Sequence, residues 1–251
     1  MGITIKKWKL YGNMFYQCFS SFNRPRYARF YDNQTLIDKI LNEQKSLIRY
    51  GDGEFDIIEG KSIHYQEHSL KLGERLDDIL CTYIKDENES PYIIAMPEYF
   101  FNGYGFRILF SRLRLSAWSH SRYLFHKRYD KKVHYGDAFL FHKDNEQQYR
   151  QIWEKAEIKK IIFVHNNVKY AEIFLKKYKI KTDFIKIPSE NAYKIANDIL
   201  KKIKAASSDE KVMVLISAGP CGKILAYELA KDGIWAIDTG HCWDAPLDKN
   251  R

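Results

Sequence analysis

The sequence predicts an α/β protein with a single Rossmann-like domain, in which a mostly parallel sheet is flanked by helices. Short apolar runs typical of strands alternate with helical segments of about 10–15 residues, most clearly in the last hundred residues. Such alternation produces crossover connections between parallel strands. The chain has 251 residues, of which 45% are hydrophobic and 29% charged. This composition supports a sizeable core and excludes intrinsic disorder.

Residues 1–30 differ from the rest and predict an amphipathic N-terminal helix with a basic start, ahead of the main domain at 31–251. Large side chains recur there at helical spacing after a group of lysines: Trp8, Tyr11, Phe15, Cys18, Phe19 and Phe22, after Lys6, Lys7 and Lys9. The helix either docks on the core or makes peripheral contact with an anionic membrane through residues 1–22.

Within the main domain, apolar periodicity and breaker residues predict the order of elements. The expected helices cover residues 35–43, 70–84, 147–156, 169–178, 192–203 and 224–231. The expected strands cover residues 47–50, 92–96, 138–141, 161–164, 184–187, 212–216 and 235–237. Residues 98–135 are rich in arginine and aromatic side chains and predict a helical insertion, whose arginines either bind phosphate or lie in solvent.

Charge and cysteine content restrict the class of protein. With 41 Lys and Arg against 32 Asp and Glu, the net charge is +9, which suits nucleic acid, an anionic membrane or phosphorylated substrates. No nucleic-acid-binding motif accompanies the charge, so we expect no nucleic-acid partner. The four cysteines lie far apart, and no apolar run approaches the roughly 18 residues of a membrane span. We therefore expect a cytoplasmic protein.

The loop after the first expected strand of the main domain carries two carboxylates. Asp52 and Glu54 stand two residues apart, so an extended backbone would point both the same way. Gly51 and Gly53 allow a close, bent backbone. Oxygen ligands in an open site suit Mg²⁺ or Mn²⁺, with a diphosphate completing the coordination. An acidic β-turn is the simpler alternative.

Three later loops follow strands at the same expected edge of the sheet. Gly219 and Pro220 lead into a helix whose first amides would bind an anion, although the segment is not a Walker loop. Ser189 is either a helix N-cap or a ligand contact. Asp238 and His241 share a loop and are candidates for a base, a ligand or a nucleotide contact. Each loop alone also fits a purely structural role.

Taken in order, these segments resemble the motifs of the GT-D glycosyltransferases over about residues 45–245. The stretch 49–54 resembles their RxGDGE signature with its Asp-x-Glu motif. The later matches are Gly136-Asp-Ala-Phe139, Ile187-Pro-Ser-Glu-Asn-Ala192, Ser217-Ala-Gly-Pro220, Ala226-Tyr-Glu-Leu-Ala230 and Ala236-Ile-Asp-Thr-Gly-His241. The chain departs from the family pattern at residues 221–222, after the Gly-Pro pair, and at residues 242–244, after the Gly-His pair.

The resemblance implies transfer of a sugar from a nucleotide sugar, typically UDP-glucose or a relative, with Mn²⁺ or Mg²⁺. The implied acceptor is a bacterial surface glycan, a lipid-linked glycan or a glycoprotein, reached from the inner face of the membrane. Asp52 and Glu54 become the metal motif, and Asp238 and His241 further catalytic candidates, with Glu98 as another possible base. The implied nucleotide-sugar contacts are Arg49, Gly51, Gly53, Pro188, Ser189, Asn191, Ala192, Gly219 and Pro220.

Two other functions fit the same residues. A metal-dependent phosphohydrolase would use the same two carboxylates, but the sequence lacks the further His and Asp ligands that two-metal sites gather. A basic module that binds nucleotides or nucleic acid without catalysis would show affinity that falls steeply with salt.

Overall fold

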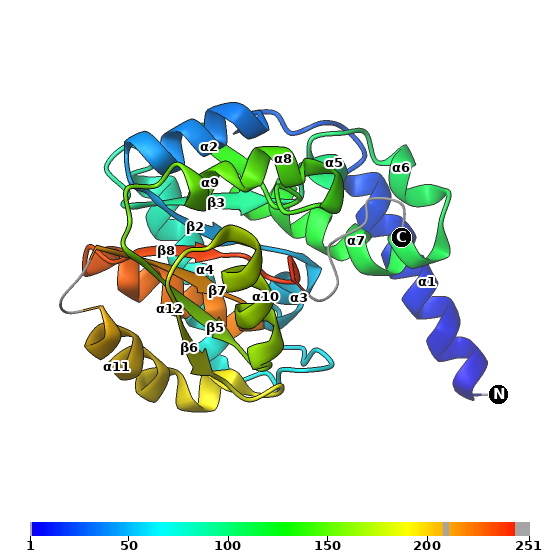
Figure 1. Ribbon diagram of the computed structural model, residues 1–251. Coiled ribbons are helices and arrows are strands. Elements are labelled where there is room, and N and C mark those ends of the chain that lie inside the picture. Colours follow the sequence, from blue (N-terminus) through cyan, green and yellow to red (C-terminus); the bar gives the residue numbers. More distant parts are fainter. Residues whose placement is uncertain (1, 208–210, 244–251) are drawn as a thin grey trace.

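The computed structural model describes residues 2–207 and 211–243 and contains an eight-stranded sheet in which every pairing is parallel. The spatial order is β1-β4-β3-β2-β8-β7-β5-β6. This confirms the predicted α/β class with a parallel sheet flanked by helices (Figure 1). The strands are β1 Arg29–Phe30, β2 Ser46–Arg49, β3 Tyr92–Met96, β4 His134–Asp137, β5 Lys160–His165, β6 Thr182–Lys186, β7 Val212–Ile216 and β8 Trp235–Asp238.

Helices cover both faces of the sheet, which explains why the central strands are apolar at nearly every position. Alternate strand residues enter two separate cores: Ile162 faces one and Phe163 the other. The first core also contains side chains of α1 Gly2–Ser20, α3 Asp52–Ile58, α4 Leu70–Lys85, α7 Arg112–Leu124, α11 Ala196–Ala206 and α12 Gly219–Lys231. The second contains side chains of α2 Asn33–Asn42, α8 Glu146–Tyr149, α9 Gln151–Glu154 and α10 Val168–Tyr178.

Strand β2 is central to the topology because it pairs with β3 on one side and β8 on the other. Beyond β3 the sheet continues with β4 and β1, and beyond β8 it continues with β7, β5 and β6. The carboxyl ends of β2 and β8 therefore lie together at the place where parallel α/β sheets bind ligands.

Two predicted elements are wrong. The strand expected at 138–141 ends earlier, as β4 at 134–137, because the Asp137 carboxylate accepts hydrogen bonds from the amides of Phe139 (3.0 Å) and Glu98 (3.3 Å) and turns the chain. The apolar residues 138–141 that follow β4 are buried, but they form a turn. The helix expected at 147–156 is two short helices, α8 and α9, with Arg150 between them.

The segment from Glu98 to Tyr129 is helical and packs against α1. It comprises α5 Glu98–Phe101, α6 Phe106–Leu109, α7 and the π-helical turn Phe125–Tyr129. Met14 and Cys18 of α1 are buried there, and Gln17 hydrogen-bonds the His120 ring at 3.0 Å. The second half of α1 is thus docked, whereas Trp8 and Leu10 in its first half are exposed. Across the described residues, no helix has both the length and the apolar character needed to cross a bilayer.

Candidate functional site

A cavity of about 270 Å³ opens at the carboxyl edge of the sheet, beside β2 and β8. All four loops singled out in the sequence contribute to its wall. The predicted site residues that line it are Arg49, Gly51, Asp52, Gly53, Glu54, Pro188, Ser189, Ala192, Gly219 and His241. Asn191, Pro220 and Asp238 are not part of the wall.

The sequence predicted an extended backbone for the two carboxylates of the first loop, and this prediction is wrong. They occupy the first turn of α3, with Gly51 as the N-cap residue. Glu54 folds back so that its Oε2 accepts a hydrogen bond from the Gly51 amide at 2.8 Å. Acidic residues are favoured in a first helical turn, and Glu at the third position is part of a capping box, so the sequence did contain a signal for this helix start.

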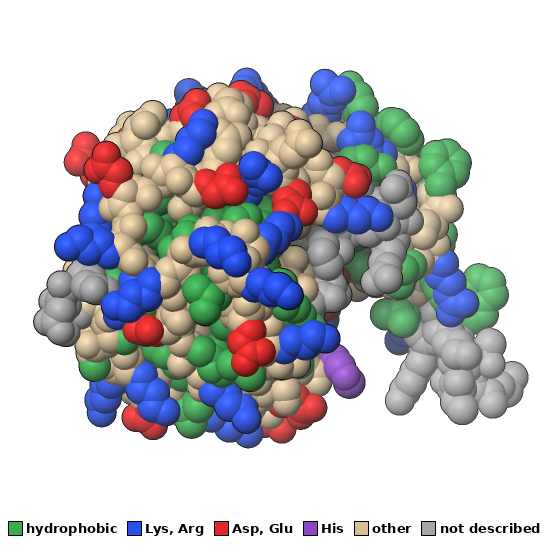
Figure 2. All heavy atoms as spheres, viewed as in Figure 1, with side chains coloured by type: hydrophobic (Ala, Val, Ile, Leu, Met, Phe, Trp, Pro, Cys, Tyr) green, Lys and Arg blue, Asp and Glu red, His purple; other side chains and the backbone are tan. Residues whose placement is uncertain are grey.

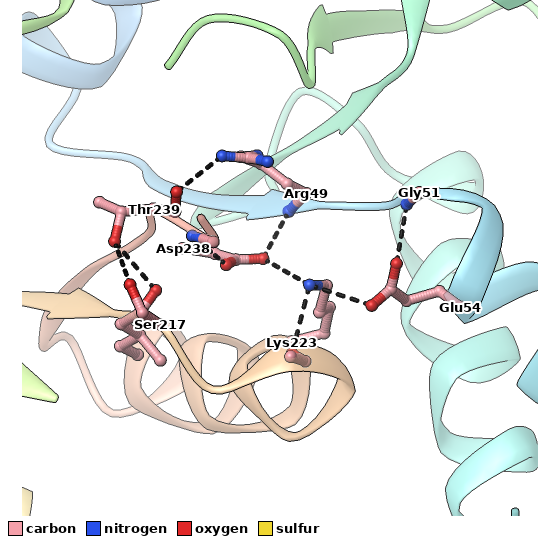
Figure 3. A network of polar contacts seen from close by, with 10 residues as sticks. Arg49, Gly51, Glu54, Ser217, Lys223, Asp238 and Thr239 are labelled. Atoms are coloured by element: carbon pink, nitrogen blue, oxygen red, sulfur yellow. Dashed lines mark hydrogen bonds and ion pairs between the residues drawn. The ribbon is translucent and has the colours of Figure 1, made fainter. Parts of the chain in front are cut away.

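Lys223 of α12, which lines the cavity, contacts two of the predicted carboxylates (Figure 3). Its Nζ lies 3.1 Å from Glu54 Oε1 and 3.2 Å from Asp238 Oδ2, and it donates to the Gly219 carbonyl at 3.2 Å. Burial disfavours the ammonium, but Asp238 and then Glu54 hold its pKa above the ordinary lysine value. Lys223 is thus a fixed cation in the cavity wall.

Asp238 was a candidate base, but it is fully buried and its carboxylate oxygens bind neighbouring groups of the protein. Its Oδ2 accepts from the Arg49 amide at 3.2 Å in addition to Lys223, and its Oδ1 accepts from the Gly240 amide at 3.2 Å. These contacts tie the ends of β2 and β8 to α12. Asp238 therefore positions the groups around it and is not among the residues that line the cavity.

Arg49 enters the cavity wall from the end of β2. Its Nη1 donates to the Thr239 carbonyl at 2.8 Å, and its guanidinium lies 5.4 Å from the centre of the Phe141 ring. Its Nε is buried without a hydrogen-bond partner. A Cβ on Gly240, where φ is +51°, would come within 3.0 Å of Arg49 Nη2. The glycine therefore gives the guanidinium its space.

Asp52 differs from the other carboxylates because no ion pair balances it within the described part of the chain. Burial, and then the nearby charge of Glu54, raises the pKa of Asp52 from its ordinary value to about 6. A cation at this position would relieve both effects. The residue is therefore suited to hold a positive ligand.

Asn191 was expected to contact a nucleotide, but it organises a neighbouring loop. Its Oδ1 accepts from the Glu67 amide at 2.8 Å, and its own amide donates to the Tyr65 carbonyl at 2.9 Å. Tyr65 in turn lines the cavity and stands edge-on to His241, with ring centres 6.2 Å apart. Pro220 lies in the first turn of α12 and is buried.

Several residues of the cavity wall were not predicted from the sequence. Trp118 reaches it from α7 and stacks on Phe100 at 4.3 Å, so the aromatic insertion does contribute to the site. His165 joins it from the end of β5. Glu98, named above as a possible base, lines a different cavity with Arg24 and Arg107. A single lysine in an otherwise apolar helix start was the available signal for Lys223.

Comparison with known proteins identifies the family. The family model of the glycosyltransferase GT-D fold matches residues 47–245, which include every residue that lines the cavity. The chain belongs to the GT-D glycosyltransferase family. This agrees with the order of motifs from Arg49 to His241.

Individual relatives support the assignment to GT-D. Over 82% of its length, the chain is 23% identical to the glycosyltransferase GlyD of Streptococcus pneumoniae serotype 4 and 25% identical to the probable glycosyl transferase Gly of Streptococcus gordonii. It spans only 26% and 30% of those proteins. The matched region is thus under a third of each of these two relatives.

Solved structures share the GT-D fold. One is the domain of unknown function 1792, described as a distinct glycosyltransferase fold, with a TM-score of 0.70 at 22% identity over 92% of this chain and 83% of that chain. Another is a glycosyltransferase with this domain from Streptococcus sanguinis, with a TM-score of 0.69 at 22% identity over 86% and 82% of the two chains. At this identity the likeness concerns the fold alone.

Proposed function

We propose that this GT-D protein transfers a sugar from a nucleotide sugar, UDP-glucose or a relative, to a bacterial surface glycan, lipid-linked glycan or glycoprotein. The observation that carries the proposal is the pairing, in one cavity, of a carboxylate without an ion-pair partner in the described chain, Asp52, and an arginine with an unused buried donor, Arg49. A metal–diphosphate group presents the complementary charges. The names of the two streptococcal relatives support the same class of reaction.

The donor set at the start of α3 fits Mn²⁺ or Mg²⁺. Asp52 would hold the ion directly, and Glu54 would contribute lone pairs while keeping its contact with Lys223. When bound, such an ion stabilises the negative charge of the leaving diphosphate. Two protein carboxylates leave room for the phosphate oxygens that Mg²⁺ sites commonly include.

The chain's own groups would stabilise the same leaving group. The first amides of α12 begin at Gly219 in the cavity wall, where a helix favours an anion. The Arg49 guanidinium, whose Nε has no hydrogen-bond partner, adds fixed positive charge from the end of β2. Charges held in place before the reaction are effective because they need no reorganisation when the bond breaks.

A base is needed if an acceptor hydroxyl is to lose its proton during the transfer. His241 is the remaining candidate that lines the cavity, since Asp238 is buried and Glu98 lies elsewhere. His241 is exposed and stands beside Tyr65, so an acceptor could approach it from solvent. We propose His241 as the proton acceptor. Because nucleotide sugars are cytoplasmic metabolites, we also propose that the reaction occurs in the cytoplasm, at the inner face of the membrane.

A thermal-shift panel tests the donor site. We expect one class among UDP-, GDP-, TDP- and CMP-sugars to raise the melting temperature only when Mn²⁺ is present, since a ligand of the native state stabilises it. Asp52→Asn should lose this Mn²⁺-dependent shift. Asp56→Asn is the matched control, because Asp56 lies on the same helix and pairs with Lys61 at 2.8 Å. A wild-type protein that responds to no nucleotide sugar would contradict the proposal.

The reaction products separate this proposal from a phosphohydrolase. A transferase should release little free sugar without an acceptor, whereas hydrolysis at the rate of turnover would favour the phosphohydrolase. In the described ranges, no group of three or more His, Cys, Asp and Glu side chains is arranged to hold a metal ion, so no observation favours a two-metal hydrolase.

A further inference from the structure

The positive charge of the chain is concentrated in two segments that pack together. Residues 1–30 and 99–129 contain 12 Lys and Arg and no Asp or Glu. Because the whole chain carries +9, the other 190 residues carry a net −3. We call these two segments, which meet through α1 and α7, the cationic lobe. The protein is therefore electrically polarised, with the α/β body slightly acidic.

The cationic lobe also exposes large apolar side chains. The exposed fractions are 85% for Phe110, 74% for Trp8, 63% for Leu113, 62% for Phe19 and 59% for Leu10. Figure 2 shows hydrophobic and basic side chains gathered over the part of the molecule that carries α1, α6 and α7. Exposed apolar side chains in such a group are typical of an interaction surface.

Contacts between the two segments make these side chains one surface. The Arg112 guanidinium lies 5.6 Å from the Tyr11 ring centre, which places the start of α7 beside the middle of α1. The Gly105 amide donates to the Phe22 carbonyl at 2.7 Å, which places the start of α6 beside the end of α1. Phe110 and Leu113 thus lie close to the exposed turns of α1 that carry Trp8 and Leu10.

We propose that the cationic lobe docks this protein on an anionic membrane surface. Bilayers with acidic lipids attract Lys and Arg and also accept aromatic and aliphatic side chains at the boundary between headgroups and acyl chains. A nucleic acid would use the cations but would leave Phe110 and Leu113 without an apolar environment. The docking surface extends beyond the N-terminal helix, since its most exposed side chain, Phe110, lies in the turn between α6 and α7.

The position of the surface relative to the cavity gives it a functional meaning. Leu113 and Trp118 belong to α7, and five residues of α-helix span about 8 Å along the axis. A membrane that contacts Leu113 therefore lies close to the cavity that Trp118 lines. If the proposed transferase function holds, this arrangement suits an acceptor carried on a lipid. The membrane contact itself does not depend on that function.

Vesicle sedimentation tests the proposal without any turnover. We expect the full chain to sediment with phosphatidylcholine vesicles only when phosphatidylglycerol is added, and to be released by high salt. Phe110→Ser with Leu113→Ser should weaken binding at least tenfold, and Arg112→Gln about fivefold. The control is Ile173→Ser with Leu175→Ser on α10, where both side chains are also exposed, at 49% and 43%, but lie on the body. This control should bind as the wild type does.

Two further measurements keep the outcomes distinct. Circular dichroism melts should show that all variants fold, since the changed positions are exposed; if the double variant does not fold, Lys9→Gln with Arg112→Gln replaces it. Failure of the wild type to bind anionic vesicles, or equal weakening by the α10 control, overturns the proposal. Salt-sensitive binding of a DNA duplex without vesicle binding would overturn it in favour of a nucleic-acid surface.

Discussion

Asp52 and Glu54 lie in one helical turn, yet their charges are balanced differently. Glu54 shares a buried lysine with Asp238, whereas Asp52 faces the cavity with no ion-pair partner in the described ranges. The difference follows from the helix, which turns the two side chains to different neighbours. It explains why burial and repulsion raise the pKa of Asp52. A residue that costs stability in this way is typical of a functional site.

Asp52→Asn should stabilise the metal-free protein at neutral pH while reducing transferase activity at least a hundredfold. With the folded pKa at about 6 and the ordinary value at 3.8, the folded protein keeps a proton on Asp52 that the unfolded chain has released. The free energy of unfolding therefore falls as pH rises from about 4 to about 6. Asn removes this loss and should raise the melting temperature by about 2–4 °C at pH 7.

Thermal melts of wild type and Asp52→Asn across pH 4–8 measure this effect. The two curves should meet near pH 4, separate between about pH 4 and pH 6, and stay a constant distance apart above that. Asp56→Asn should follow the wild type, because that carboxylate already pairs with Lys61. Parallel curves at every pH would show that the pKa of Asp52 is not raised in the folded protein.

Lys223→Met should destabilise the protein by about 3–5 kcal/mol, because it leaves Glu54 and Asp238 buried without their shared cation. Denaturant unfolding of the variant measures this loss. A second change, Asp238→Asn, should recover part of it by removing one unpaired charge. Lys201→Met on the exposed side of α11 is the control and should change stability little. An unchanged free energy of unfolding in Lys223→Met would contradict the conclusion that this lysine balances the two buried carboxylates.

At the scale of elements, helix α7 connects the N-terminal helix, the insertion and the cavity. Its Trp118 lines the cavity, while its Arg122 is fully buried and donates to the carbonyls at the end of α1, including Ser21 at 2.5 Å and Asn23 at 2.6 Å. The same guanidinium donates to the carbonyls of Phe100 and Phe101 in α5. Burial lowers the pKa of Arg122 to about 10, so it stays charged at neutral pH.

Arg122→Met should loosen the whole cationic lobe, because the carbonyls at the ends of α1 and α5 would lose their donor. We expect a loss of at least about 3 kcal/mol and faster cleavage of α1 by protease under native conditions. Arg150→Met is the control, since Arg150 is exposed and pairs with Glu154 at 2.9 Å. If Arg122→Met resists protease as the wild type does, α1 is held by its apolar contacts alone.

At the scale of the whole molecule, the chain separates two kinds of surface. The α/β body carries the cavity and a slight negative charge, and the cationic lobe carries the positive charge and the exposed aromatic side chains. Deleting residues 1–22 is therefore a poor test of membrane contact, since it would remove Met14 and Cys18 from the core and leave Arg122 without the Ser21 and Phe22 carbonyls. Exposed point substitutions separate docking from folding.

Much of the fold could be predicted because period and length are local properties. The buried strands at 92–96 and 212–216 read as short apolar runs and were found at those positions. The run at 138–141 looks the same but is a buried turn, because Asp137 binds the amides that follow it. A pattern of apolar residues reports burial and does not by itself distinguish a strand from a turn.

The sequence alone determined the parallel α/β class, the order of its elements and the loops that form the cavity, since alternation of strands and helices places those loops at one edge of the sheet. Only the tertiary structure decided what each side chain does there. Lys223 balances Glu54 and Asp238, Asn191 supports the loop of Tyr65, and Trp118 reaches the cavity from the insertion. These contacts join residues far apart in the chain, and local periodicity carries no information about such pairs.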